Sequence, residues 1–370
     1  MTDERATNPI IASRNKLKLG LFGLNVSNGC SMVEMPGTLK AEWGESVRIA
    51  TKADQLGFEA IIPVARWKGM GGAVNFNNRN FETFTWAAGL SALTKNAAIF
   101  ATFHVPTAHP VRAAKEVATI DHIAGGRFGL NIVAGWNAKE IGMFGVAQRE
   151  HDARYDYADE WIELCKALWT RDEPFDWDGA EFAAQGLVSI PHPVQRPWPT
   201  LMSAGNSARG QRFAAQHADV NFVVAPTVEA AGKIAAETRR IAREDFGREI
   251  QVFGQASIVC RSSEAEAREY LRHAVHDRGD WEGVRNLLDV LIPNSQSALG
   301  EGWESMATNL IGGYGAIPLV GTPDQVVAGL AGFADAGLDG LTLSWIDYDA
   351  GLDQFERDLL PRLRAAGLRA

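Results

Sequence analysis

The alternation of short apolar runs with amphipathic runs is the feature that most restricts what this chain of 370 residues can fold into. An apolar run of about four to eight residues is typical of a buried strand, whereas apolar side chains about three or four positions apart indicate a helix. Eight such strands, each followed by a helix, predict a closed parallel (β/α)8 barrel of the α/β class. The predicted strands begin near residues 16, 58, 97, 128, 200, 220, 250 and 339.

The predicted helices complete this alternation, and they cover residues 45–56, 82–94, 110–123, 154–169, 207–217, 227–245, 263–276, 323–336 and 352–366. The sequence has no clear linker, so we expect one barrel domain over residues 1–370. Two excursions interrupt it: residues 171–198 are rich in Pro, Asp and Trp, and residues 277–321 are poorly periodic. An open, doubly wound parallel sheet is the alternative. Its dinucleotide-binding form would need G-x-G-x-x-G directly after a first strand, and the sequence has no such turn there.

The charge balance and the cysteines argue against several classes of function. The chain has 36 Lys and Arg against 45 Asp and Glu, a net charge of -9, which argues against a general nucleic-acid surface. Cys30, Cys165 and Cys260 form no CxxC pair, so we expect reduced thiols and neither a disulfide framework nor a zinc site. The histidines have no metal-ligand spacing, and we expect no metal. The sequence has no signal-peptide core or membrane-length apolar run, and we expect a cytoplasmic protein.

The stretch from Gly125 to Asn137 combines a turn, a strand and a loop. Gly125 and the glycine after it are expected to end a helix, and residues 128–133 form an apolar run typical of a strand buried on both faces. Asn131 interrupts that run with an amide that can donate and accept, which suits the edge of a heterocyclic ring; the alternative is a core amide bonded to the backbone. The small residues that follow would admit a flat ligand beside the planar surface of Trp136.

Two other strand ends, and the segment after the Trp136 loop, carry polar or aromatic side chains. Ala65, Arg66 and Trp67 begin a basic, glycine-rich loop at residues 66–72, which suits an anionic or electron-rich ligand or is a solvated loop. His104, past the third strand, is a candidate general acid or base near neutral pH, or a structural histidine. Glu140 could bind a ligand hydroxyl or lie on a helix surface.

An anion site is predicted where a strand meets a helix at residues 203–207. A strand that runs into small residues and then into a helix N-terminus presents free N–H groups, and Gly205 favours a phosphate over a merely capped helix. Arg154 and Tyr155 begin another predicted helix, where the arginine could contact a phosphate through two hydrogen bonds. Asp152 is a possible N-cap of that helix.

These stretches together resemble a known family. Residues 120–136 (IDHIAGGRFGLNIVAGW) resemble the signature of the bacterial-luciferase-like flavin monooxygenases, and the chain is most similar to their pyrimidine oxygenase and dimethyl sulfone monooxygenase branch. Residues 150–155 (EHDARY) and 203–207 (SAGNS) fit the same branch. The resemblance covers about residues 17–225 and continues weakly to the C-terminus. It implies a (β/α)8 barrel that binds reduced FMN (FMNH2), supplied by a separate NAD(P)H-dependent flavin reductase, and that oxygenates a small molecule with O2.

The resemblance also implies roles for individual residues. The flavin ring would face Asn131, and the ribityl phosphate would contact Arg154, Tyr155 and Ser207. The full set of implied cofactor contacts is Ala65, Arg66, Asn131, Glu140, Arg154, Tyr155, Gly205 and Ser207.

The substrate side is implied to lie against Trp67, Phe103, His104 and Trp136, with His104, Asn131 and Trp136 as candidate catalytic residues and His104 as a proton donor or orienting group. Pyrimidine oxygenases usually have Lys in place of Arg66 and small residues in place of Phe103 and His104. Phe103 and His104 would therefore narrow the pocket, which argues against pyrimidine ring opening.

We therefore expect a two-component monooxygenase acting on a heterocyclic amide, a sulfone or a substituted aromatic compound, assembled by family habit as a homodimer or homotetramer. Residues 66–72 and 277–321 are candidate lids. Two alternatives remain: hydride transfer with a deazaflavin on the same barrel, and a non-catalytic flavin-binding protein.

Overall fold

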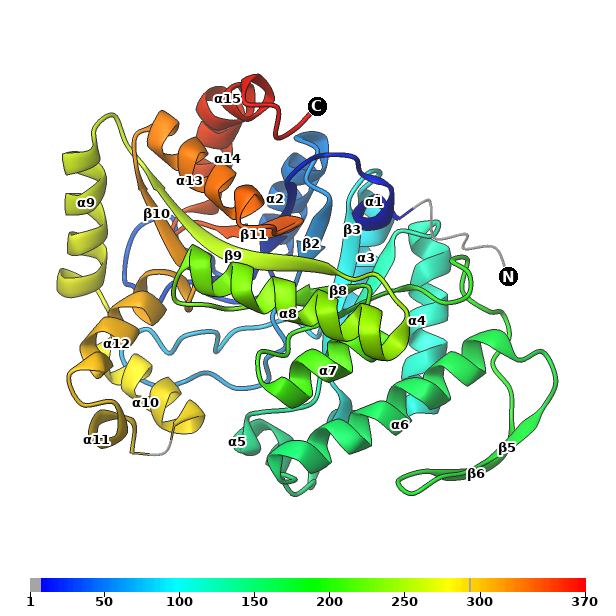
Figure 1. Cartoon of the computed structure of the whole chain (residues 1–370). Coiled ribbons are helices and arrows are strands. Elements are labelled where there is room, and N and C mark those ends of the chain that lie inside the picture. The colour runs from blue at the N-terminus through cyan, green and yellow to red at the C-terminus, as the bar shows by residue number, and fades with distance from the viewer. Residues whose placement is uncertain (1–7, 293) are drawn as a thin grey trace.

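A computed structural model of the chain describes residues 8–292 and 294–370, and within them eight parallel strands close into a barrel (Figure 1). Each barrel strand begins at a predicted start or at most two residues after it, which confirms the predicted (β/α)8 fold. The barrel strands are β1 (Lys18–Phe22), β2 (Ala60–Ile62), β3 (Ala98–His104), β4 (Phe128–Val133), β7 (Thr200–Ser203), β8 (Val220–Phe222), β9 (Gln251–Cys260) and β11 (Gly340–Ser344).

The long strand β9 closes the barrel and also extends past it. Its first residues pair with β8, where Val220 lies opposite Gln251, and its middle pairs with β11, where Leu343 lies opposite Ala256. Its last five residues pair with a ninth strand, β10 (Ile317–Gly321), which takes the edge that β8 leaves free. The sequence did not predict β10.

The helices that alternate with the barrel strands follow the predicted ranges closely. They are α2 (Trp43–Gln55), α3 (Thr83–Leu93), α4 (Pro110–Ala124), α6 (His151–Thr170), α7 (Ala208–His217), α8 (Val228–Phe246), α13 (Pro323–Asp335), α14 (Tyr348–Gln354) and α15 (Leu360–Ala365), with the short helices α1 (Pro9–Ala12) and α5 (Ala138–Ile141). Helix α6 begins one residue after its N-cap, Glu150, so the prediction of Asp152 as the N-cap is wrong. None of the helices in the described ranges is long and apolar enough to span a membrane.

Local sequence explains why helix α4 leads into strand β4 as predicted. Pro110 occupies the first turn, where its missing N–H costs nothing, and the His109 side chain accepts a hydrogen bond from the N–H of Val111. Gly125 ends the helix with φ +60°, a left-handed conformation that glycine adopts without steric cost. The chain can therefore reverse and enter the barrel at Phe128.

Side chains alternate between the barrel interior and the surrounding helices. The interior is filled by large apolar side chains, among them Phe22, Ile62, Phe100, Met202 and Phe253. A Cβ on Gly129 would lie 2.4 Å from the ring of Phe100, so glycine is needed there to let that ring fill the interior. Since successive residues of a strand face opposite sides, the neighbours of these residues pack against the helices.

The segment at residues 171–198 contains a two-stranded antiparallel hairpin, β5 (Phe175–Asp178) and β6 (Ala183–Leu187), which projects from the barrel beside α6 (Figure 1). We call residues 171–198 the hairpin excursion. The sequence predicted an irregular segment here, because the strands are short and separated by residues with turn propensity.

Residues 262–292 and 294–321 form a second, mostly helical excursion with β10 at its end. Its helices are α9 (Glu264–Arg272), α10 (Trp281–Leu291), α11 (Ser295–Leu299) and α12 (Gly302–Gly313). They pack around their own apolar cluster, to which α10 contributes Val284, Leu287 and Leu288. The sequence of residues 277–321 is poorly periodic because these helices are short and are separated by polar and glycine residues that weaken the periodic signal.

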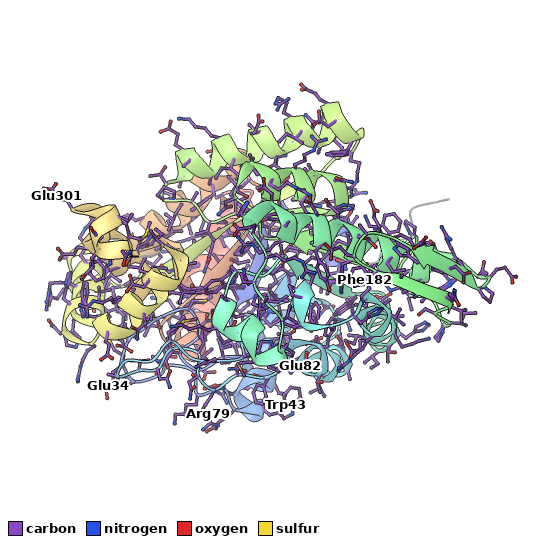
Figure 2. All side chains as sticks on the ribbon, turned by 90° about the horizontal axis from the view of Figure 1, so that it is seen from below. Glu34, Trp43, Arg79, Glu82, Phe182 and Glu301 are labelled. Carbon is purple, nitrogen blue, oxygen red and sulfur yellow. The ribbon has the colours of Figure 1, made fainter. Side chains whose placement is uncertain are left out.

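The carboxyl ends of the barrel strands open at the lower side of Figure 1, because α5 follows strand β4 and lies there, opposite α1 and α15. We call the region formed by the loops after β2, β3, β4 and β7 the mouth. Figure 2 looks at the molecule from this side: Glu301, at the start of α12, lies at the left edge, and Phe182, beside β6, lies to the right of the centre. The two excursions therefore lie on opposite sides of the mouth.

Candidate active site

Arg66, directly after β2, is the central cation of the mouth, and its side chain is fully buried. Its Nη1 lies 3.5 Å from Oε1 of Glu140, and its Nη2 donates to the hydroxyl of Tyr314 at 2.8 Å. The guanidinium also lies over the ring of Trp136, with Cζ 5.3 Å from the ring centroid. A buried charge of this kind needs a paired carboxylate, and Glu140 supplies it.

Glu140 fixes the loop after β2. Helix α5 carries it into the interior, and its Oε1 accepts hydrogen bonds from the N–H groups of Trp67 at 2.9 Å and Lys68 at 3.1 Å. The side chain is fully buried, so the alternative of a surface carboxylate is wrong. Its second oxygen, Oε2, is buried and has no hydrogen-bond partner.

Asn131 links the carboxyl ends of three neighbouring strands. Its Nδ2 donates to Oγ1 of Thr102 on β3 at 3.2 Å, and the Thr102 hydroxyl donates to the carbonyl of Pro63 after β2 at 2.5 Å. The Oδ1 of Asn131 is buried and has no partner. The amide is therefore oriented by Thr102, and its acceptor remains available.

His104 ends β3 on the same face as Thr102, because residues two apart in a strand face the same side. It is 2% exposed, and its Nδ1 has no partner. Burial, followed by the positive charge of Arg66, lowers the pKa of His104 to about 3. The imidazole is therefore neutral at physiological pH. The expectation of a general acid that titrates near neutral pH is wrong, and a neutral orienting group is what the geometry allows.

Phe103 and Trp67 do not line the interior of the mouth. Phe103 faces the helices, where its ring packs 5.1 Å from Phe84 and 5.7 Å from Trp161, centroid to centroid. The prediction that Phe103 narrows the substrate pocket is wrong, because the register of β3 turns this ring toward the helices. Trp67 is 38% exposed and packs edge-on against Phe144, so it lies at the rim.

The loop after β4 connects the Arg66 cluster to helix α6. Gly135 has φ +97°, which favours glycine, and a Cβ there would lie 2.9 Å from Ile141. Its carbonyl accepts hydrogen bonds from Nη1 of Arg154 at 2.6 Å and from Nε2 of Gln148 at 3.2 Å. Arg154 Nε and Gln148 Oε1 are buried and have no partner.

The N-terminus of α7 packs closely against Tyr155. Ser207 is the N-cap, and its Oγ accepts from the N–H of Gly210 at 3.1 Å. A Cβ on Gly210 would lie 2.6 Å from the Tyr155 hydroxyl, and one on Gly205 would lie 2.6 Å from the backbone of Gly210. The first N–H groups of a helix have no acceptor within it, so this turn presents N–H donors. The phenol of Tyr155 packs against the glycine backbone beside them.

The predicted site residues thus come together at one end of the barrel. Ala65, Arg66, Asn131, Glu140, Arg154, Tyr155, Gly205, Ser207, His104 and Trp136 belong to the adjoining loops and strand ends of the mouth, whereas Trp67 lies at its rim and Phe103 lies outside it. Of the fourteen buried side-chain N and O atoms without a hydrogen-bond partner in the described part of the chain, six belong to this region: those of Arg66, His104, Asn131, Glu140, Gln148 and Arg154. Native proteins rarely leave such atoms unpaired, and their clustering indicates a binding site.

Three residues of the mouth escaped the sequence analysis. Thr102 could have been found from its position two residues before His104, on the same face of the strand. Gln148 and Tyr314 had no such signal, since Gln148 lies in an irregular loop and Tyr314 lies 248 residues from its partner Arg66. Across the described ranges, no group of three or more His, Cys, Asp and Glu side chains could hold a metal ion.

Fold and site together define an α/β-barrel protein with a buried polar binding site at the carboxyl ends of its strands, the position at which enzymes of this architecture work. The chain belongs to the luciferase-like monooxygenase family, whose family model matches residues 23–340.

Individual relatives support this assignment. The chain is 28% identical over 351 residues to pyrimidine monooxygenase RutA of Acinetobacter baylyi, covering 93% of this chain and 94% of that protein. It is 30% identical over 330 residues to the RutA protein of Cronobacter sakazakii, covering 85% and 94%. Among solved structures, riboflavin lyase (RcaE) with modified FMN and the substrate riboflavin has the same fold, with a TM-score of 0.86 at 21% identity over 96% of this chain and 92% of that one.

Proposed function

We propose that this protein is a two-component, flavin-dependent monooxygenase that uses reduced FMN and O2 to oxygenate a small organic molecule. One observation carries the proposal: six side chains at the mouth, Arg66, His104, Asn131, Glu140, Gln148 and Arg154, keep a buried polar atom without a partner. Buried polar atoms are usually paired, and a cluster of unpaired ones at one end of the barrel is what a site completed by a bound ligand would leave.

The chemistry of these atoms fits FMN. The isoalloxazine edge carries both N–H donors and carbonyl acceptors, which would complement the acceptors Asn131 Oδ1 and Glu140 Oε2 and the donor Arg66 Nε. The ribityl phosphate would bind at the N-terminus of α7 beside Arg154 and Tyr155, where Gly205 and Gly210 let the turn, the helix start and the Tyr155 hydroxyl pack closely together.

When bound, reduced FMN supplies the electrons that activate O2. The residues of this chain bind and orient it: Asn131, held by Thr102, fixes the ring edge, and Arg66 places a buried positive charge beside the electron-rich ring. Burial of these groups excludes water from the reaction. His104, which is neutral, orients the substrate by hydrogen bonding and carries no charge to it.

The substrate classes we propose are heterocyclic amides, sulfones and substituted aromatic compounds. Glu140 balances the charge of Arg66 and His104 is uncharged, so the part of the mouth around these residues offers a substrate hydrogen bonds without a net charge. The curated relatives named pyrimidine monooxygenase support the first class. A separate NAD(P)H-dependent flavin reductase would supply the reduced cofactor, and we expect a homodimer or homotetramer in the cytoplasm.

The site is tested by titrating the protein with reduced FMN without oxygen. Asn131→Ala and Ser207→Ala should each weaken binding by about tenfold, because each removes a hydrogen-bonding group at one end of the cofactor. Substrate-dependent O2 uptake with reduced FMN then tests the reaction across sulfur, nitrogen and aromatic compounds. Hydride transfer with a deazaflavin and no O2 uptake would instead support the alternative oxidoreductase.

Two matched variants control for structural damage. Asn221→Ala removes an amide that also lies on a barrel strand and also donates to a threonine at 3.2 Å, but toward α8 and away from the mouth. Ser263→Ala removes an N-cap with the same hydrogen bond at the start of α9. Both controls should bind FMN as the wild type does. Unchanged affinity in Asn131→Ala and Ser207→Ala would contradict the site.

A further inference from the structure

Tyr314 brings a polar group from the helical excursion into the mouth. Its hydroxyl accepts the hydrogen bond from Arg66 Nη2 at 2.8 Å, across 248 residues of sequence. Its ring packs 5.3 Å from that of Phe76 and contacts both the barrel interior and the apolar cluster of the excursion. The Tyr314 side chain therefore lies between the barrel interior and the helical excursion.

The backbone of Tyr314 has an unusual, left-handed conformation. It caps α12 with φ +54° and ψ +38°, a left-handed position that glycine normally occupies, although glycines stand on both sides of it. A Cβ on Gly313 would lie 2.7 Å from the Ser257 hydroxyl, so the end of α12 packs tightly against β9. A non-glycine residue in this region costs about 1 to 3 kcal/mol and persists where the surroundings impose it.

The hydrogen bonds of Arg66 show how the position of Tyr314 affects the mouth. Nη1 faces Glu140 at 3.5 Å, Nη2 is held by Tyr314 at the shorter distance of 2.8 Å, and Nε is buried without a partner. A guanidinium is planar, so fixing Nη1 and Nη2 also fixes the direction of Nε. Tyr314 thereby helps to determine where the buried, unpartnered Nε–H of Arg66 points.

We propose that Tyr314 is a positioning residue for cofactor binding: it orients Arg66 so that Nε meets the flavin ring, and it couples the helical excursion to occupancy of the mouth. This inference rests on the proposed function, because it takes FMN as the ligand. The phenol proton, which the hydrogen bond from Arg66 does not use, is available to the same ligand.

The test compares how tightly FMN binds to the wild type and to Tyr314→Phe. Binding is measured by fluorescence titration with oxidised FMN and by anaerobic titration with reduced FMN. The variant should bind about tenfold to hundredfold more weakly, because a hydrogen bond to a charged group is lost. Tyr270→Phe is the matched control: Tyr270 also contacts an arginine, with Arg261 Cζ 3.8 Å from its ring centroid, but it lies in α9 away from Arg66. This control should bind FMN normally.

Two further readouts separate positioning from a structural role. In an Arg66→Lys background, Tyr314→Phe should change FMN affinity by less than about twofold, because the two residues act as one unit. Amide hydrogen exchange should show that FMN protects residues 302–321 in the wild type but not in Tyr314→Phe, whereas the start of α7 is protected in both.

The outcomes distinguish this inference from the proposed function. A wild type that binds no FMN overturns both. A wild type that binds FMN, with Tyr314→Phe binding equally well, overturns only the role of Tyr314. Additive effects of Tyr314→Phe and Arg66→Lys would also overturn it, since they would mean that the tyrosine does not act through the arginine.

Discussion

Glu140 at the mouth and Glu160 beside the hairpin excursion each hold a loop by accepting hydrogen bonds from backbone N–H groups, but they differ in burial and in how many of their oxygens are paired. Glu140 accepts hydrogen bonds from two backbone N–H groups with one oxygen and faces Arg66. Glu160 accepts from the N–H groups of Glu181 and Phe182 and from the indole of Trp177, using both oxygens. Glu140 is fully buried with one oxygen unpaired, and Glu160 is partly exposed with both oxygens paired.

The difference shows which carboxylate is structural. Burial alone would raise the pKa of Glu160, but the donors around it outweigh burial and lower the pKa, so the group is satisfied as an anion without any ligand. Glu140 has an acceptor that neither the protein nor, at its depth, bulk water satisfies. Hydrogen-bond satisfaction, more than burial or charge, therefore separates these two carboxylates.

The largest expected effect comes from removing the Glu140 carboxylate. Glu140→Ala should lower the free energy of unfolding by about 3 to 5 kcal/mol, because it leaves the buried guanidinium of Arg66 without a counter-charge. Glu160→Ala should cost about 1 kcal/mol, since water replaces the lost acceptor. Urea unfolding measures both, and Glu140→Gln, which keeps an acceptor, should fall between them. Equal losses in the two alanine variants would mean that the two sites are equivalent.

A second, smaller effect concerns the pH dependence of the mouth. His104 has its pKa lowered to about 3, so between that value and the pKa of the unfolded state the unfolded chain binds more protons. Stability is therefore lost as the pH falls. From about pH 7.5 to about pH 5, the wild type should lose about 2 kcal/mol more than His104→Gln. Urea unfolding at the two pH values tests this, and parallel losses would show that His104 is protonated in the folded state.

The smallest effect belongs to the hairpin. Trp177→Phe removes one of the three donors to Glu160 and should lower stability by about 1 kcal/mol or less, with FMN affinity unchanged. Because the pKa of Glu160 is lowered, the contribution of these bonds is present above the pKa of the unfolded state and is lost as the pH falls through that of the folded state. Urea unfolding at neutral pH measures the loss of stability, and titration with FMN measures the affinity. A loss of FMN affinity would show that the hairpin acts on the mouth.

The sequence predicted much of this molecule, because each barrel strand is an apolar run bounded by turns. It also placed Asn131, Arg154 and Ser207 on segments that the barrel brings together. It failed for Phe103, since a strand buried on both faces has no polar alternation to show which side chains point inward. For Glu140 the residues themselves left a surface carboxylate open as an alternative, because its burial depends on a partner 74 residues away.

The order of strands and helices, and hence the barrel with polar loops at one end, was determined by the sequence itself, because local hydrophobic periodicity specifies each element. Only the tertiary structure decided which polar atoms find partners and which remain free. Tyr314 reaches Arg66 from the far end of the chain, and His104 stays neutral because of what surrounds it. Hydrogen bonding and desolvation depend on neighbours in space, and no local pattern of residues encodes them.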